Sequence, residues 1–395
     1  MPSLRDRWNA LWLRPMARRV PLLGVVAVVV LLIGSGGAAA CSTPPSASPP
    51  YTVLTTIPLV DAIAANTSMV FAQGVQVCSQ IWGISPSGTV GVYATVPVAD
   101  SACTEGGLAL APNTTYVGSG GGSPPPDGVV IAEASPLWHT GHRACHGSPT
   151  NTTLFDVVAG RLFAITDGGS TVTQIATFPT SGKTSENMGL AYDQVGDFDH
   201  ELIVTSSYGG EVWLVNPEGA VSLLVTLHTY IGGPAVAPVN FGSYGGDIII
   251  AEKTRGHIVA VTPGGTVSVV ADWSKANAVT FPTLSARHHH GGWVPQWSGN
   301  GGNGCGQGCT FGPDHDALFV ANYSSGAVEA FPVSDLAHFY GQGFVAGGLN
   351  QGIAGFAADG TTTLFASQTE RLSDIASMYC PTVTTTCGGS GCGEH

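Results

Sequence analysis

The sequence predicts an all-β fold made of repeated four-stranded antiparallel units, and this prediction follows from composition and spacing. Only 10% of the 395 residues are charged, whereas 55 are Gly and 26 are Pro. Such a composition favours turns and short strands over helical bundles. A pattern of short apolar strand, Gly-containing turn and second strand occurs five times, with turn glycines 81, 50, 46 and 95 residues apart. A period of about 45 residues is typical of a β-propeller.

Each recurrence predicts a β-hairpin, because Gly accepts the positive φ of a tight strand reversal. The five hairpins are expected at residues 81–96, 162–178, 212–227, 258–273 and 353–367, with turns at Gly88, Gly169, Gly219, Gly265 and Gly360. The 95-residue spacing corresponds to two periods, and the apolar strand at 327–335 is the expected member between them.

Further apolar strands precede most of the hairpins and complete the predicted blades. Innermost strands are expected at 107–112, 189–194 and 233–238, and second strands at 128–135, 201–210, 247–256 and 317–326. The result is a six-bladed β-propeller of four-stranded antiparallel blades, at 51–98, 105–180, 186–228, 230–273, 276–333 and 334–367. Five or seven blades are the alternatives, since the first and last segments contain no clear innermost strand.

The N-terminus predicts export. Five Arg residues lie within the first 20 positions, an apolar run covers 21–33, and small residues lead to Cys41. We therefore expect residues 1–40 to be a signal peptide or a membrane anchor, followed by a Pro/Ser tether at 41–50. The small residues before Cys41 resemble a lipobox, which implies lipidation of Cys41 and a cell-surface lipoprotein. Cleavage without lipidation would instead give a secreted protein.

Charge and cysteine content agree with an extracytoplasmic location. From Cys41 onward the chain has 8 basic and 25 acidic residues, so we expect no nucleic-acid partner, because such binding depends on Lys and Arg that neutralise phosphates. Eight further Cys remain for disulfides, whose connectivity is open, although Cys145 with Cys103 is one pair considered. The disulfide candidates are Cys78, Cys103, Cys145, Cys305, Cys309, Cys380, Cys387 and Cys392. Three of them lie in a tail, 368–395, beyond a propeller expected at 51–367.

The segments at 247–273 and 317–331 resemble NHL-repeat, YVTN-type and gluconolactonase-like propellers. The resemblance covers roughly residues 67 to 367 and specifies the fold more than the function, because this fold hosts lactonases, lyases, dehydrogenases and binding scaffolds. For gluconolactonase-like enzymes it implies a divalent metal in the central channel, held by a Glu, an Asn and an Asp. Oxygen ligands of this kind suit Ca²⁺.

Two residues are candidates for such a channel site. Asn187, in the sequence Glu-Asn-Met-Gly-Leu-Ala, matches the Asn of the metal-binding set, and Glu252 is the second candidate. The matching Asp position falls at 232–234, which is Gly-Gly-Pro and supplies no carboxylate. The set is therefore incomplete, and a turn residue that caps the start of a strand is the alternative role of Asn187.

Two histidine clusters stand outside the repeat pattern. His139, His142 and His146, with Cys145 among them, have a spacing that suits a transition-metal site. A disulfide at Cys145 is the competing interpretation. The adjacent residues 288–290, all His, have diverging side chains and are expected in a solvated loop.

These observations predict an exported, surface-tethered propeller that binds a protein, a glycan or a small molecule and has no complete catalytic set. Inserted loops at 113–152 and 283–312 carry Trp138, Trp293 and Trp297 as candidates for ligand contact. A Ca²⁺-dependent hydrolase or lactonase of the gluconolactonase type is the alternative, and a lyase of the streptogramin type is a third.

Overall fold

A computed structural model of the chain describes residues 51–66, 69–85, 87–100, 103–112, 152–179, 187–282, 284–289, 292–297, 316–339 and 341–379. The chain divides into two units, 1–46 and 47–395, and the described residues all belong to the second. Its elements in these ranges are β-strands and short 3-10 helices, as the composition predicted. None of these helices has the length and apolar character needed to cross a membrane.

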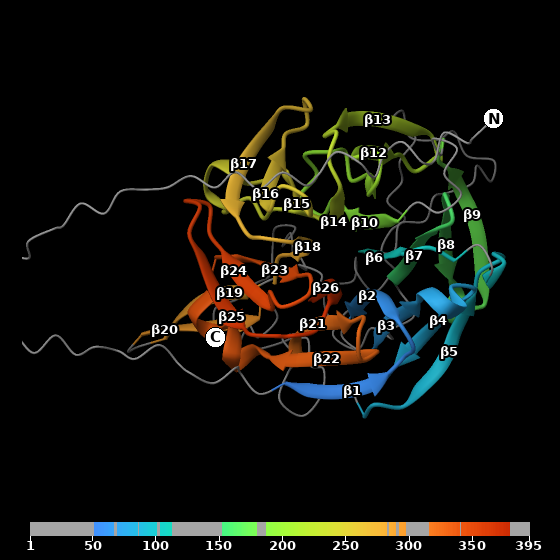
Figure 1. The fold of residues 1–395 in the computed structure, drawn as a ribbon, viewed down its shortest axis with the longest axis horizontal. Coiled ribbons are helices and arrows are strands. Elements are labelled where there is room, and N and C mark those ends of the chain that lie inside the picture. Colours follow the sequence, from blue (N-terminus) through green and yellow to red (C-terminus); the bar gives the residue numbers. More distant parts are fainter. Residues whose placement is uncertain are drawn as a thin grey trace, which may run out of the picture. The chain divides into compact units, whose positions relative to one another are not determined.

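Blades 1 to 4 each use four consecutive antiparallel strands that run from the centre outward (Figure 1). Blade 1 contains β2 (Val60–Asn66), β3 (Val70–Gly74), β4 (Gln80–Ile84) and β5 (Val90–Thr95). Blade 2 contains β6 (Gly107–Pro112), β7 (Thr152–Val158), β8 (Arg161–Thr166) and β9 (Thr171–Thr177). Blade 3 contains β10 (Met188–Tyr192), β11 (Leu202–Ser206), β12 (Glu211–Val215) and β13 (Val221–Thr226). Blade 4 contains β14 (Ile231–Val236), β15 (Ile248–Glu252), β16 (His257–Val261) and β17 (Val267–Asp272).

The strands of blades 5 and 6 are interleaved along the sequence. Blade 5 contains β18 (Ala276–Thr280), β23 (Gly343–Gly347), β24 (Ile353–Phe356) and β25 (Thr362–Ala366). Blade 6 contains β26 (Leu372–Tyr379), β21 (Asp316–Asn322), β22 (Ala327–Pro332) and, outermost, β1 (Thr52–Thr56). A separate hairpin of β19 (Leu284–His289) and β20 (Gly292–Trp297) precedes β21. The 3-10 helices within the described ranges are η2 (Val75–Val77), η6 (Asp167–Gly169), η7 (Gly242–Tyr244) and η8 (Val333–Phe339).

The six-bladed prediction and its five hairpins are confirmed. The hairpins are β4–β5, β8–β9, β12–β13, β16–β17 and β24–β25. Their turn glycines all have φ between +75° and +92°, which explains why Gly marks the repeat so clearly. The predicted innermost strands of blades 2, 3 and 4 also form, as β6, β10 and β14.

The predicted boundaries of the outer repeats differ from the structure. The strand after residue 51 is β1, which pairs with β22 and not with blade 1. The second strand of blade 2 is β7, whereas the predicted segment 128–135 lies outside the described residues. The tail begins later than residue 368, because β26 is the innermost strand of blade 6. Pairing between segments this distant in sequence leaves no local signal, and the predicted blades 276–333 and 334–367 were wrong for that reason.

Apolar side chains fill the spaces between neighbouring blades. Five buried clusters do this, and the largest joins blades 1, 5 and 6 through residues such as Ile63, Phe331 and Phe344. The other four join blades 1 and 2, 2 and 3, 3 and 4, and 4 and 5. Each blade is therefore apolar on both faces, and burial of these faces is the main stabilising contribution.

The innermost strands approach one another closely around the centre (Figure 1). A Cβ atom added to Gly232 would lie 1.6 Å from the carbonyl oxygen of Asn277 on β18. One added to Gly189 on β10 would lie 2.8 Å from the Cα of Gly233. Only Gly permits these contacts. Gly189 and Gly232 therefore allow the innermost strands to pack closely around the centre.

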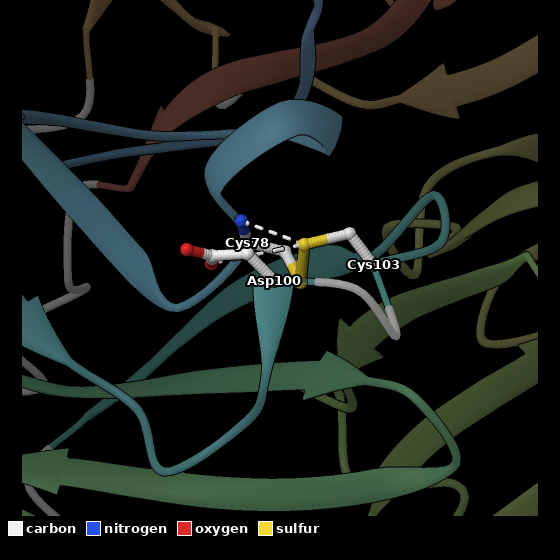
Figure 2. A group of neighbouring side chains, drawn as sticks. All are labelled: Cys78, Asp100 and Cys103. Carbon is white, nitrogen blue, oxygen red and sulfur yellow. Dashed lines mark hydrogen bonds between the residues drawn. A yellow bond between two sulfur atoms is a disulfide. The ribbon is translucent and has the colours of Figure 1, made fainter.

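Cys78 and Cys103 form a disulfide that joins blade 1 to the segment before blade 2 (Figure 2). The pairing of Cys145 with Cys103 considered above is therefore wrong. Asp100 lies beside the two sulfurs, and its carboxylate accepts a hydrogen bond from the backbone N–H of Ser79 at 3.1 Å. Cys41, Cys145, Cys305, Cys309, Cys380, Cys387 and Cys392 lie outside the described residues.

Removal of this disulfide should destabilise the protein. The bond closes a loop with a sequence separation of 25 residues, for which the loss of loop-closure entropy corresponds to about 3 kcal/mol. We expect the double variant Cys78→Ala/Cys103→Ala to lose about that much free energy of unfolding in urea titrations. The neighbouring substitution Ser79→Ala serves as the control. A loss below about 0.5 kcal/mol in the double variant would contradict the prediction.

Asp156 should make stability depend on pH. Its carboxyl is fully buried between blades 1 and 2, where Gln73 Nε2 donates to Oδ2 at 3.2 Å and Oδ1 has no partner among the described residues. Burial raises the pKa of Asp156 to about 8, and the Gln73 hydrogen bond opposes this rise. The folded protein thus holds a proton that the unfolded chain releases near pH 4. This contribution to stability is fully present below about pH 4 and is lost as pH rises to about 8.

The variant Asp156→Asn isolates this effect. The free energy of unfolding of the natural protein should fall by about 1.4 kcal/mol per pH unit, relative to the variant, between about pH 5 and pH 8. Urea unfolding at several pH values measures this difference. Parallel pH profiles for the two proteins would show that Asp156 is ionised in the folded state.

Candidate functional site

A cavity of about 880 Å³ occupies the centre of the propeller and is lined by all six innermost strands. These strands are rich in Ala and Gly, and wall positions such as Ala64, Ala109, Ala191, Ala235 and Ala376 carry only a methyl group. Small side chains leave a space that larger ones would fill. The cavity therefore follows directly from the composition of the innermost strands.

Charged side chains gather at one end of this cavity. Asp61 and Asp374 lie near the starts of β2 and β26, Glu105 precedes β6, and Lys253 follows β15. The start of an innermost strand and the end of its antiparallel neighbour lie at the same end of the sheet, so the topology brings these groups together. With Arg371, which precedes β26, they form what we call the charged cluster.

Glu105 is the centre of the charged cluster. Its Oε1 accepts a hydrogen bond from Arg371, and its Oε2 accepts one from Asn187 Nδ2 and lies 3.7 Å from Lys253 Nζ. The backbone N–H of Glu105 donates to Asn187 Oδ1 at 3.3 Å. Both carboxylate oxygens are thus engaged by groups from three other blades.

Both cations of the cluster also stack on tyrosine rings. Lys253 Nζ lies 4.7 Å from the centroid of Tyr230, whose hydroxyl accepts from Asn187 Nδ2 at 3.1 Å. The Arg371 guanidinium carbon lies 4.4 Å from the centroid of Tyr323. Cation–π contacts and the shared carboxylate together hold the two positive charges in place.

Asp374 and Asp61 differ in their hydrogen bonding. Asp374 Oδ2 accepts from the backbone N–H of Ile63 at 3.0 Å, and Oδ1 accepts from that of Ile375 at 2.9 Å. Asp61 is only 6% exposed, lines the cavity, and makes no hydrogen bond with its carboxyl group to any described residue. Backbone hydrogen bonds therefore hold the carboxyl group of Asp374, whereas that of Asp61 lies at the cavity wall without a hydrogen-bond partner among the described residues.

Burial shifts the protonation of these groups towards their neutral forms. Burial, and then the charges of Glu105 and Asp374, raise the pKa of Asp61 well above its ordinary range, against the opposing effect of Lys253 and Arg371. Burial raises the pKa of Asp374 to about 7, although the two backbone N–H groups and Lys253 oppose it. Burial also lowers the pKa of Lys253, while Glu105 and Asp61 raise it. The cavity thus holds one carboxyl group, Asp374, that exchanges its proton near neutral pH, beside two groups whose neutral forms burial favours.

The structure places only one of the two predicted channel residues in the cavity. Asn187 lies in its wall, beside Glu105. Glu252 is the last residue of β15; it does not line the cavity, and its carboxylate accepts from Arg255 at 3.2 Å. The next residue, Lys253, takes the position in the wall instead.

The other predicted site residues lie beyond what the structure describes. His139, His142, His146, Cys145, Trp138 and the lipidation candidate Cys41 fall in ranges outside the described residues, and of Trp293 and Trp297 only the backbone, in β20, is described. The transition-metal prediction and the loop-contact prediction therefore stay predictions.

The residues of the charged cluster do not fit a divalent cation. Glu105 and Asn187 would be its ligands, but both oxygens of Glu105 already accept from positive or amide groups. A dication at this point would face Lys253 and Arg371 at contact distance, which costs Coulomb energy in a buried site. Another geometric grouping of ligand-type residues in the described ranges is Cys78, Asp100 and Cys103, whose sulfurs are joined as a disulfide and are not thiolates (Figure 2).

Sequence reasoning missed Asp61, Glu105, Lys253, Arg371 and Asp374. Asp61 and Asp374 lie on the two innermost strands that had no clear sequence signal. A usable signal existed in the run Val-Asp-Ala-Ile-Ala-Ala-Asn at 60–66, where a single acid interrupts small and apolar residues. A charge within such a run rarely lies in the core without a role.

Comparison with known proteins finds similar folds without a matching sequence family. No protein-family description matches the chain, and no curated protein does. One similar solved structure is an inactive variant of virginiamycin B lyase from Staphylococcus aureus with quinupristin, at 12% identity over 56% of this chain and 59% of that one, with a TM-score of 0.36. The chain thus spans 59% of the length of that lyase.

Two further similar structures cover more of their own length. A putative gluconolactonase has 12% identity over 73% of this chain and 93% of that one, with a TM-score of 0.41. Regucalcin from Agrobacterium tumefaciens, described as a calcium-binding protein, has 11% identity over 72% and 94%, with a TM-score of 0.42. Similarity at these identities concerns the fold alone.

Loss of the Glu105 carboxylate should destabilise the propeller. The variant Glu105→Gln leaves Lys253, whose side chain is 13% exposed, and Arg371 without their counter-ion. We expect a loss of about 1–3 kcal/mol in the free energy of unfolding. The exposed turn residue Glu218 provides the matched control Glu218→Gln. Combining Glu105→Gln with Lys253→Met should recover part of the loss, and strictly additive effects would contradict the pairing.

Calcium should not stabilise the protein through this cavity. A ligand at 100 times its dissociation constant adds about 2.7 kcal/mol to the free energy of unfolding, and we expect no such gain from millimolar Ca²⁺ in a thermal denaturation series. The chelator-treated protein should behave like the untreated one. A Ca²⁺-dependent rise in Tm that Asn187→Ala removes would contradict this prediction.

Proposed function

We propose that the protein is an exported propeller that binds a small molecule in its central cavity. The cavity itself carries the proposal: its volume of about 880 Å³ falls within the range of about 300–1,000 Å³ that is usual for small-molecule sites. Its lining also combines aliphatic side chains with polar and charged groups that can fix the orientation of a ligand. Among the partner classes that the sequence left open, this geometry favours a small ligand.

The N-terminal sequence supports the cellular setting of the proposal. A basic segment, an apolar run and small residues before Cys41 are the features of an export signal. Lipidation of Cys41 would hold the propeller at the cell surface through the tether at 41–50. The binding site would then face the extracytoplasmic space.

A cavity-filling series tests the location of binding. A thermal-shift screen of a small-molecule library identifies compounds that raise Tm, and Ala235→Leu and Ala376→Leu, both in the cavity wall, should weaken their binding. Filling the site should cost on the order of tenfold in affinity or more, equivalent to about 1.4 kcal/mol. Ala220→Leu, in the exposed β12–β13 turn, is the matched control. Equal affinities in all four proteins would place binding outside the cavity.

One observation favours a second candidate, a hydrolase or lyase. The cavity holds Asp374, with a pKa raised by burial to about 7, and Lys253, with a pKa lowered by burial. A carboxyl group that gains and loses its proton near neutral pH, beside a lysine whose neutral form burial favours, suits general acid–base chemistry. A panel of lactones, esters and cyclic depsipeptides tests this candidate. Turnover that Lys253→Met reduces by about 100-fold or more, with Ala220→Leu unchanged, would support it.

A further inference from the structure

The charged cluster contains one more carboxyl group than it has cations. Its acids are Asp61, Glu105 and Asp374, and its cations are Lys253 and Arg371. Both cations contact the same carboxylate, that of Glu105. Neither forms an ion pair within salt-bridge distance with Asp61 or Asp374 in the described part of the chain.

The unmatched charge belongs to Asp61. The carboxylate of Asp374 already accepts two backbone hydrogen bonds, from Ile63 and Ile375. The carboxyl group of Asp61 makes no hydrogen bond to the described residues. Asp61 is only 6% exposed and lies in the cavity wall. A buried carboxyl group without a partner is costly, and a ligand in the cavity could supply that partner.

Aliphatic side chains contribute to the cavity wall beyond the charged cluster. Leu110, Leu190, Val279 and Ile375 line the cavity further along β6, β10, β18 and β26. The cavity thus has charged groups at one end, and aliphatic side chains interspersed with polar ones such as Thr280 and Ser377 along its walls. A ligand that fills it therefore needs one charged or hydrogen-bonding end and a compact apolar part.

We propose that the cavity binds a small amine, with its ammonium group paired to Asp61 and its apolar body against the aliphatic wall. This inference rests on the proposed function and adds the chemical class of the ligand. An ammonium group supplies the missing positive charge and donates up to three hydrogen bonds. An anionic ligand would instead add a second unmatched negative charge.

The protonation of the site agrees with this ligand class. Without a ligand, burial raises the pKa of Asp61, and a proton then takes the place of the missing cation. The groups that face Asp61 are Glu105 and Asp374, which favour its protonation, and Lys253 and Arg371, which oppose it. An ammonium ligand must displace that proton. Its affinity should therefore rise with pH, and the ionisation of Asp374, with a pKa of about 7, adds to this rise between about pH 6 and pH 8.

Three probes of equal size test the proposal on the full-length protein. They are 2-phenylethylamine, 2-phenylethanol and phenylacetate, which share an apolar body and differ in the charge of one end. Ligand-observed NMR titration should give the amine an affinity about tenfold or more above that of the alcohol, with phenylacetate weakest. The preference for the amine should increase from about pH 6 to pH 8.

Two Asn variants identify the counter-ion. In Asp61→Asn, the amine should lose about 30-fold in affinity and bind no better than the alcohol. Asp359→Asn, which removes an exposed acid from the β24–β25 turn, should leave the preference intact. Near-UV circular dichroism shows whether Asp61→Asn retains its fold, and the comparison of the three probes on the natural protein does not depend on that variant.

The outcomes separate this inference from the proposed function. Binding of the alcohol at least as tight as that of the amine, and lost in Ala376→Leu, overturns the amine class and leaves cavity binding standing. Amine binding that Asp61→Asn does not change overturns the role of Asp61. Amine binding that survives Ala235→Leu and Ala376→Leu overturns both the inference and the proposed function.

Discussion

The closure of the ring is the constraint on which the rest of the structure depends. Blade 6 takes its strands from three separate stretches of chain, because β1 pairs with β22, β21 pairs with β26, and β26 adjoins β2 of blade 1. The β1–β22 and β2–β26 pairings join residues more than 250 positions apart. Once they form, the six innermost strands surround one axis, and the close approaches at Gly189 and Gly232 fix the width of the channel.

The site exists only in the closed ring. Glu105 and Arg371 belong to segments 266 positions apart, and Ile63 and Asp374 to segments 311 positions apart. Each of these pairs joins the first two blades to the last. The charged cluster thus contributes to closure through its ion pairs, while closure in turn buries the cluster and shifts the pKa values of Asp61, Asp374 and Lys253. The charged cluster and the closure of the fold thus depend on the same set of interactions.

Local patterns predicted much of the fold from the sequence. The turn glycines, such as Gly219 and Gly265, need a positive φ and so mark each hairpin, and the number of blades followed from their period. The interleaving of blades 5 and 6 could not be predicted, because the sequence of β22 does not indicate whether β18 or β26 is the innermost strand of its blade. The candidate site was predicted only at Asn187. Glu252 and Lys253 are neighbours in sequence, and which of them faces the cavity depends on how β15 ends, which no periodicity shows.

The interleaving of blades 5 and 6 also determines the order in which the chain can fold. During synthesis, β21 and β22 emerge before β26, the strand that completes their blade, and more than thirty positions separate them from it. Four blades can form from consecutive residues, whereas blade 6 cannot be finished until residues 372–379 are available. Long-range strand pairing of this kind is slow and leaves strand edges unpaired in the meantime. Residues 372–379 therefore complete the core last among the described strands, so a chain that ends before them would lack the strand that joins its first blade to its last.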